Sequence, residues 1–582
     1  MSGHNTIKSF AVLVVLSLFL SIAFFSGCEK EVEKIVTKVV RDTVTVTERD
    51  TLILQIIAVD AINANPDSIA QGGSVQLTVD VTASPLAGDL TYAWFATAGS
   101  FNVTEGDTVI WKAPDDPGAY TVSVHVTDGT YIGIGSRAIG VGMYAPTVSP
   151  YYVGGPSCAC HSSVVTAWQE TAHAHAWASL QESGHAASYC NPCHTVGYEG
   201  PAGNSGYDEA PIAKFENVQC ENCHGPASDH LTGGGMEVSY DAMNCGKCHE
   251  GTHHPYYSEW QESAHAFDVE AAKAEFSASC WGCHEGVASA IRLAGDLSNF
   301  YSGGAISSRP DTSVVGYTQI TCQVCHDSHS DENLGQVRTV ADIKLVTANG
   351  ESPTISAGGT GKLCMQCHHA RRSPDNQVVV GNPSRPASFG PHESPQGDML
   401  AAKSGYHGVA PTGFNWAGPS HLLVQNSCKT CHLNMVEWSP SGPAVTGHKF
   451  EPTTLACQNC HGVINSFAEI PAADDFDGDG TVEGLQQEVS GLMELLTVAL
   501  VANGLDTTGV GLVTALGDSS ISTPLQREAG YNLIFVEADA SHGVHNPDYA
   551  VQLLQQSYRH LTGTLPKNMA VVEGDNRVVM NW

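Results

Sequence analysis

Residues 220–230 read CENCHGPASDH, in which two cysteines stand three positions apart and a histidine directly follows the second. Seven other stretches of the chain carry the same Cys-x-x-Cys-His pattern, and residues 158–161 carry a shortened form, CACH. Two thiols at this spacing can add to the two vinyl groups of one porphyrin, and the next histidine then lies under the iron. The repeated pattern therefore predicts c-type haem bound along residues 158–461.

Zinc sites and disulfides are the two alternative uses of paired cysteines. Neither requires a histidine immediately after each pair. The chain has only 27 histidines in 582 residues, yet one follows each of its nine close cysteine pairs. We therefore predict haem at each pair, with the histidine as the proximal iron ligand. The predicted thiols and proximal ligands are Cys158, Cys160 and His161; Cys190, Cys193 and His194; Cys220, Cys223 and His224; Cys245, Cys248 and His249; Cys280, Cys283 and His284; Cys322, Cys325 and His326; Cys364, Cys367 and His368; Cys428, Cys431 and His432; and Cys457, Cys460 and His461.

The CACH stretch has one residue fewer between its thiols but keeps both cysteines and His161. Two unused thiols in an exported protein are a liability, and a dead site would be expected to lose one of them. We predict nine haem c groups, the ninth on a tightened loop. A local disulfide between Cys158 and Cys160, with eight haems in total, is the alternative.

The remaining histidines are numerous enough to supply a second ligand to every iron. Sixteen are left after the nine proximal ones and the outlying His4 and His125 are set aside. Iron held by two histidines passes electrons with little rearrangement but has no open position for substrate. The predicted distal ligands are His173, His185, His230, His254, His265, His329, His392, His421, His448 and His545. We expect the others, His175, His253, His369, His407, His542 and His560, to be solvated or hydrogen-bonded to haem propionates.

Several of these histidines recur in one local context, as in WQETAH (168–173), QESGH (181–185) and WQESAH (260–265). With CENCHGPASDH and HHPYYSEW, these stretches resemble the cytochrome c554 type of multihaem protein over residues 158–284. The later stretches LCMQCHHARR, GPHESPQGDML and GVHNPDYAVQLL resemble large exported multihaem cytochromes related to nitrite reductase and hydroxylamine oxidoreductase. The resemblance implies a mostly helical wrap around closely stacked haems. No cysteine pair is followed by lysine, as in those nitrite reductases, and no spacing indicates a tyrosine cross-linked to haem.

The first residues predict export. Residues 10–25, FAVLVVLSLFLSIAFF, suit the core of a signal peptide and are short for a membrane span. They lead into FSGC, which resembles a bacterial lipobox, so we expect a signal peptide over 1–27 and lipid on Cys28. A diacyl-type anchor would hold the protein stably at a membrane. Secretion without a lipid is the alternative.

Four segments follow in the predicted organisation, which makes the fold class multidomain. Residues 28–54 alternate charged and β-branched positions and read as a tether. Residues 55–147 alternate with period two and resemble an immunoglobulin-like β-sandwich of the polycystic-kidney-disease type, with Trp94 as a core aromatic. Residues 148–470 form the mostly α or irregular multihaem core. Residues 471–582 form a C-terminal helical segment packed on that core, with helices expected to end at Asn503-Gly504 and to begin at Asn546.

One further metal site is expected in DDFDGDGTVEGLQQE. Asp475, Asp477 and Asp479, with Gly480, match the first half of an EF-hand-like calcium loop. Gln486 stands where the bidentate glutamate is usual, although Glu483 could contribute. We expect one structural calcium ion; an acidic, capped helix start is the alternative.

The balance of acidic and basic residues narrows the classes of function open to the chain. Acidic residues outnumber Lys plus Arg by 60 to 26, so the surface repels nucleic acid and suits a basic redox partner or a cation. We predict an electron-transfer cytochrome with redox partner proteins or extracellular acceptors, lipid-anchored at the outer membrane on its periplasmic or cell-surface face, with self-assembly open. The alternative is an oxidoreductase acting on nitrogen or sulfur oxyanions at one open haem iron. No catalytic residue is predicted.

Overall fold

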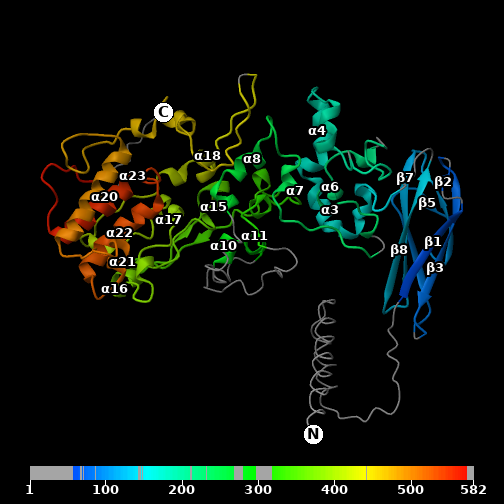
Figure 1. The fold of residues 1–582 in the computed structure, drawn as a ribbon, viewed down its shortest axis with the longest axis horizontal. Coiled ribbons are helices and arrows are strands. Elements are labelled where there is room, and N and C mark those ends of the chain that lie inside the picture. Colours follow the sequence, from blue (N-terminus) through cyan, green and yellow to red (C-terminus); the bar gives the residue numbers. More distant parts are fainter. Residues whose placement is uncertain are drawn as a thin grey trace, which may run out of the picture.

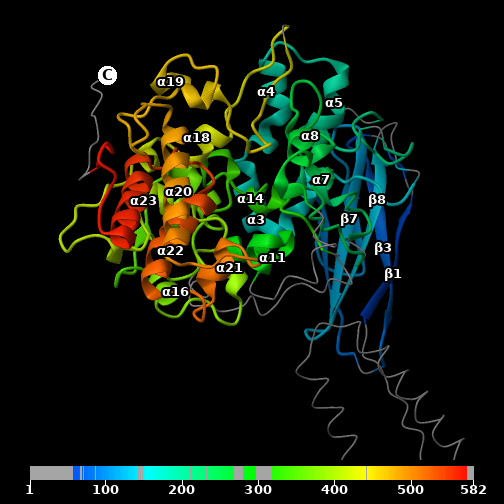
Figure 2. The ribbon, with the colours of Figure 1, turned by 60° about the vertical axis from the view of Figure 1, so that its left-hand side comes forward.

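The computed structural model describes residues 57–572 except positions 66–67, 70, 86, 142–145, 147, 199, 210–212, 231–232, 268–279, 296–316 and 441. The predicted signal peptide, Cys28 and the whole predicted tether (28–54) lie outside the described residues. Strands occupy one side of the molecule, and the long C-terminal helices occupy the other (Figure 1). The cysteine-rich segment lies between them, and the view turned by 60° keeps this order (Figure 2).

The N-terminal part consists of two four-stranded sheets. One has the order β1(Ile57–Asn65)–β3(Ser74–Ala83)–β6(Thr108–Lys112)–β5(Ser100–Phe101). The other has the order β2(Ser68–Ile69)–β8(Ile132–Val141)–β7(Gly118–Thr127)–β4(Thr91–Ala96). All neighbours pair antiparallel except β2 and β8, which are parallel. The predicted period-two strands are therefore present.

The two sheets share one apolar core. Trp94 is 2% exposed and packs in the same cluster as Trp111, Leu77 and Val124. Both indoles are tied to backbone, since Trp94 Nε1 donates to the carbonyl of Gly106 and Trp111 Nε1 to that of Ala98. Burial of alternate residues on facing strands accounts for this core.

The middle of the chain has little regular structure. Its helices are short, and several are the cysteine motifs themselves. They are α3(Ser162–Gln169), α4(Ala176–Glu182), α5(Asn191–His194), α6(Cys220–His224), α7(Met243–Gly246), α8(Tyr256–Gln261), α10(Trp281–His284), α11(Gly286–Ala294), α14(Cys322–Cys325), α15(Lys362–Met365), α16(Pro374–Val380), α17(Gln396–Leu400), α18(Cys428–His432) and α19(Gln458–His461), with a two-residue hairpin β9(Ile343–Lys344) and β10(Thr354–Ile355).

The C-terminal part holds the largest apolar cluster among the described residues. It is built from α20(Leu485–Ala502), α21(Leu512–Gly517), α22(Pro524–Asp539) and α23(Pro547–Thr562). As predicted, α20 ends at Asn503-Gly504, where Gly504 has a positive φ. Asn546 caps α23 by accepting from the Tyr549 N–H.

In the described part of the chain, no helix combines the length and apolarity needed to cross a bilayer. Antiparallel sheets followed by a mostly helical and irregular region confirm the multidomain prediction at that level.

Candidate haem-binding sites

The Cys-x-x-Cys-His motifs fold as single helical turns. In five of them the histidine N–H donates to the carbonyl of the first cysteine at 2.9–3.0 Å, as His368 does to Cys364. Residues three and four apart share one face of a helix. One turn therefore points both thiols and the imidazole to the same side, as one porphyrin requires. We number the sites 1 to 9 by their histidines in chain order: His161, His194, His224, His249, His284, His326, His368, His432 and His461.

Eight of these nine histidines face a second histidine. The two rings have their centroids 6.1–6.4 Å apart in every case. The pairs are His161–His230, His224–His329, His249–His173, His284–His392, His326–His448, His368–His265, His432–His545 and His461–His421. All eight second members are among the ten predicted distal ligands.

This separation fits an iron between the rings. Metal–imidazole bonds of about 2 Å, plus the two ring radii, place the centroids about 6 Å apart. A direct ring stack would be closer, as for His407 and Trp416, whose centroids are 4.3 Å apart. The residues present thus fit haem at each of the eight pairs.

The other two predicted distal histidines behave differently. His254 lies within electrostatic range of His194 at site 2, which helps to lower the pKa of His254, after burial and His253. His185 is exposed beyond α4, and its backbone N–H donates to Ser183 Oγ. Among the described residues no ring contact joins His185 to a proximal histidine.

Site 1 has the same arrangement despite its shorter motif. The segment Gly155–His161 is a 3₁₀ turn that is interrupted at Cys158 (φ −85°, ψ 19°). A 3₁₀ turn has three residues per turn instead of 3.6, so it closes with one residue fewer. The rings of His161 and His230 are 6.2 Å apart. Cys158 and Cys160 are both free rather than joined to each other.

Thiols of different motifs lie against one another. Five pairs are in direct hydrogen-bonding contact: Cys158–Cys220, Cys193–Cys248, Cys245–Cys322, Cys283–Cys367 and Cys364–Cys428. Further pairs are within electrostatic range, among them Cys223–Cys245, Cys223–Cys248, Cys325–Cys364, Cys325–Cys367, Cys431–Cys457 and Cys431–Cys460.

These contacts join the nine sites into one branched series. Sites 1, 3, 4, 6, 7, 8 and 9 follow one another, site 2 branches from site 4, and site 5 branches from site 7. Cys160 and His161 at one end are exposed, as are Cys460 and His461 at the other. Cys283 on the site 5 branch is buried. The two ends of the series thus lie at the surface.

Backbone carbonyls orient seven of the candidate ligand imidazoles. Nδ1 of His194 lies 2.9 Å from the Ala176 oxygen, Nδ1 of His432 lies 2.8 Å from the Phe450 oxygen, and Nδ1 of His421 lies 2.6 Å from the Val544 oxygen. Such a contact places the proton on Nδ1 and leaves Nε2 for a metal.

Two distal histidines have a carboxylate instead. Asp327 Oδ1 lies 3.3 Å from Nδ1 of His329, and Asp539 Oδ1 lies 2.7 Å from Nδ1 of His545. The Asp327 carboxylate is 33% exposed and is shared with Arg338, whose Nη1 lies 3.4 Å from Oδ2. The Asp539 carboxylate is fully buried. His329 and Arg338 hold the pKa of Asp327 near 2, and Asp539 raises the pKa of His545 against the effect of burial.

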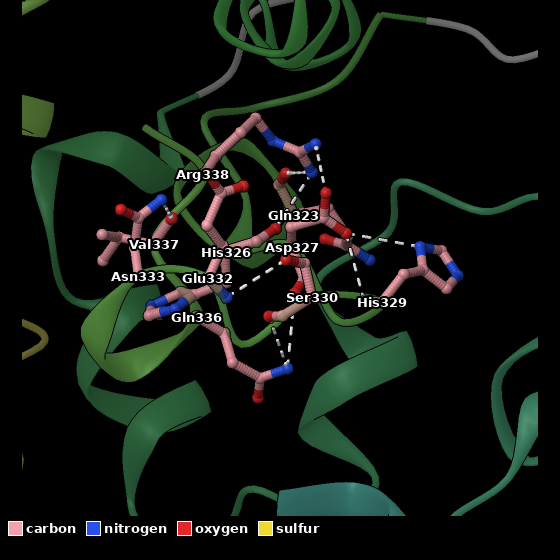
Figure 3. A network of polar contacts seen from close by, with 10 residues as sticks. All are labelled: Gln323, His326, Asp327, His329, Ser330, Glu332, Asn333, Gln336, Val337 and Arg338. Carbon is pink, nitrogen blue, oxygen red and sulfur yellow. Dashed lines mark hydrogen bonds and ion pairs between the residues drawn. The ribbon is translucent and has the colours of Figure 1, made fainter. Parts of the chain in front are cut away.

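Figure 3 shows how Asp327 is held at site 6. Arg338 reaches over the motif to donate to the carbonyls of Gln323 and His326, while Nη1 approaches Asp327. His329 extends from the other side of Asp327 toward site 3. One carboxylate thereby links the loop of site 6 to the distal ligand of site 3.

Buried carboxylates fix the irregular loops. Glu221, inside the site 3 motif, accepts from the N–H groups of Val153, Gly154 and Ala227. Glu259 accepts from the N–H groups of Thr446 and His448, and these hydrogen bonds fix the loop that carries His448. These contacts take the place of the sheets and long helices that this segment lacks.

Three side chains make contacts that the sequence did not predict. His369 is 3% exposed and bonded to the Met365 carbonyl, and His407 is bonded to Tyr549 Oη; burial holds both pKa values near 4. Both were expected to be solvated or bonded to propionates; His369 is buried away from solvent, and His407 is partly buried. Arg371 Nη2 lies 2.7 Å from Nε2 of His392 at site 5, and no sequence motif predicts this contact.

The predicted calcium loop brings its three aspartates together. One carboxylate oxygen each from Asp475, Asp477 and Asp479 lies within 4.8 Å of the others. Glu488 accepts from the N–H groups of Phe476, Asp477 and Glu483, so it braces the loop instead of pointing at a metal. Gln486 donates to the Ser541 carbonyl.

Comparisons with known proteins agree with the motifs. The family model of cytochrome c554 and c-prime matches residues 157–225. The C-type polyheme cytochrome OmcB of Geobacter sulfurreducens, in strains DL-1/KN400 and ATCC 51573/DSM 12127/PCA, is 26% identical over 200 residues, which cover 31% of this chain and 25% of that protein. The match thus spans about a quarter of the length of these relatives. The crystal structure of the outer cell wall cytochrome OcwA is similar with a TM-score of 0.44 and 19% identity, covering 70% of this chain and 99% of that one.

Proposed function

We propose that this chain, a multihaem c-type cytochrome, carries electrons between redox partners through nine haem c groups, each held by two histidines. The observation that carries the proposal is the set of eight facing histidine pairs with one common separation of 6.1–6.4 Å. A protein that used haem only for binding or as a scaffold would not need a histidine on both sides of every iron.

Each pair of thiols would hold one porphyrin covalently, and the facing imidazoles would hold its iron on both sides. The bound haems would supply one-electron exchange between ferric and ferrous iron. Where the chain holds an imidazole through Nδ1, as at His194, His421 and His432, a change of charge at the iron would require little rearrangement of that ligand. At site 2 we assign His254 opposite His194, and we leave His185 without a ligand role.

The route follows the thiol contacts. Electrons would enter or leave at sites 1 and 9, whose residues are exposed, and would pass through sites 3, 4, 6, 7 and 8 between them. The acidic balance of the chain favours partners with a basic face. Cys158 and Cys160 hold the ninth haem in this proposal, supported by the 6.2 Å spacing of His161 and His230.

The remaining features place this activity outside the cytoplasm. We propose a signal peptide over 1–27, lipidation at Cys28, a tether over 28–54 and attachment to the outer membrane. The sheets of 55–147, in an immunoglobulin-like arrangement, would act as a spacer for the haem-binding region 148–470. The segment 471–582 would close that region, with calcium bound by Asp475, Asp477 and Asp479. Self-assembly stays open.

One observation favours the alternative function, reduction or oxidation of nitrogen or sulfur oxyanions. The Arg371 guanidinium touches the ring nitrogens of His392, with Nη2 at 2.9 Å from Nδ1 and 2.7 Å from Nε2. A histidine held by arginine would leave the iron of site 5 open, with a cation beside it. Site 5 is therefore the place where this alternative would apply.

Electron paramagnetic resonance of the mature oxidised protein tests the two functions. Electron transfer alone predicts nine low-spin ferric haems and no response to nitrite or hydroxylamine. A high-spin ferric signal that shifts with either compound would contradict it and support the oxidoreductase. Removing Arg371 (Arg371→Gln) would then convert that signal to low spin.

A further inference from the structure

The acceptors of the Nδ1 protons differ in charge from one site to the next. At sites 2, 8 and 9, backbone carbonyls orient His194, His432 and His421. The distal ligand of site 8, His545, instead meets the carboxylate of Asp539, with Oδ1 at 2.7 Å from Nδ1. Site 8 thus has one neutral and one anionic acceptor.

The Asp539 carboxylate is isolated from solvent and from other cations. It is fully buried, and among the described residues its ion-pair partner is His545 alone. Ser541 Oγ donates to the other oxygen and also accepts from the backbone N–H of His545, so carboxylate, hydroxyl and imidazole form one closed unit. The buried carboxyl of Asp398 also lies within electrostatic range.

A carboxylate on Nδ1 makes the imidazole a stronger electron donor to a metal on Nε2, and its negative charge favours the more positive oxidation state. Low polarity around the group strengthens both effects. From this contact we infer that Asp539 lowers the reduction potential of the site 8 haem. The inference rests on the proposed function, since it takes His432 and His545 as the ligands of that iron.

Because of the position of site 8, a lowered reduction potential there would have a functional consequence. Site 8 lies between site 7, which also joins sites 5 and 6, and the exposed site 9. A low potential at site 8 makes electron delivery to site 9 depend on how fully the sites behind it are reduced. Asp539 would therefore set a threshold for output at the His461 end of the series.

The chain provides a matched control in Asp327. It also faces a distal histidine, but at 3.3 Å, one-third exposed and beside Arg338. Solvent and the arginine screen its charge, so its effect on site 3 should be small. Both aspartates can be replaced by asparagine, which keeps an oxygen to accept the Nδ1 proton and removes the charge.

The test is an optical and paramagnetic redox titration of the full-length, haem-loaded protein and its variants. Asp539→Asn should shift the reduction equilibrium of one low-spin haem toward the ferrous form by about tenfold, which is about 59 mV for a one-electron couple. Asp327→Asn should shift its haem by clearly less. Ser541→Ala removes a donor to the carboxylate and should shift the site 8 haem the opposite way.

The outcomes distinguish a failure of this inference from a failure of the proposed function on which it rests. If Asp539→Asn keeps every haem and its low-spin spectrum but titrates like the unchanged protein, the inference is wrong while the function stands. If Asp539→Asn does not fold, the Ser541→Ala titration decides, and an unmoved or raised potential overturns the inference. If the unchanged protein has no low-spin haem with two histidines at this site, the proposed function itself fails.

Discussion

The rings of His161 and His230 lie 6.2 Å apart and 25° from parallel, although His161 follows the only cysteine pair with one intervening residue. The equivalent separation at seven other sites is 6.1–6.4 Å. The tighter 3₁₀ turn of Gly155–His161 takes up the missing residue. Site 1 therefore has the geometry of a haem site with an altered attachment loop.

The first prediction concerns the number of haems. Replacing both thiols of site 1 (Cys158→Ala with Cys160→Ala) should lower the intact mass of the mature protein by one haem, because the site would lose its covalent links. The same double change at Cys457 and Cys460, at the other exposed end, should have the same effect and serves as the control. An unchanged haem count in the first variant, beside a loss in the second, would leave eight haems.

The second prediction concerns the distal ligands. His230→Ala should open the iron of site 1 and produce a high-spin ferric signal, since the imidazole that faces His161 is gone. The control is His185→Ala, at an exposed histidine that faces no proximal histidine among the described residues, and it should leave the low-spin spectrum unaltered. A high-spin signal in His185→Ala, or none in His230→Ala, would reverse these assignments.

The β-to-helical order could be predicted from the sequence, and so could the thiols and histidine that share one face of a turn, because these features depend on spacings of two, three and four residues. It also indicated which histidines are available as partners. It did not indicate which partner goes where, since His448 faces His326 across 122 positions, and His545 faces His432 across 113. Such pairings depend on the contacts that fix the irregular loops. For example, Glu259 accepts a hydrogen bond from the backbone N–H of His448 and so fixes the loop that carries it.

The repeated context of His173, His185 and His265 shows what a local sequence pattern cannot predict. Two of the three face a proximal histidine, and the third is exposed. Local sequence fixes the helical turn that precedes each histidine but not what packs against it. His407 shows the reverse case, because it is held by Tyr549, 142 positions away, in a segment that carries no repeat.

The third prediction concerns the acidic loop. Calcium should raise the unfolding temperature of the protein, because a ligand that binds only the folded state stabilises it by mass action. Asp477→Asn should abolish this response, since Asp477 shares the cluster with Asp475 and Asp479. Asp506→Asn, at an exposed aspartate outside the loop, is the control. An equal calcium response in both variants, or none in the unchanged protein, would rule out this site.

The fourth prediction concerns the buried carboxyl of Asp398. It accepts from the Ala370 N–H at 2.6 Å and from Ser404 Oγ, yet burial outweighs these donors and raises its pKa to about 7. A carboxyl raised in this way is protonated in the folded state and ionised in the unfolded state between about pH 4 and pH 7. The free energy of unfolding should therefore fall as the pH rises through this window, by at most about 4 kcal/mol.

Urea unfolding followed by circular dichroism at pH 5 and pH 8 measures this slope. Asp398→Asn, which cannot ionise, should lose most of the slope, and at pH 5 it should be less stable by about 1 kcal/mol because one of the two donors loses its acceptor. At pH 8 the variant should equal or exceed the unchanged protein, since it carries no buried charge. If both proteins show the same dependence on pH, the carboxyl of Asp398 is already ionised in the folded state, and the two donors outweigh its burial.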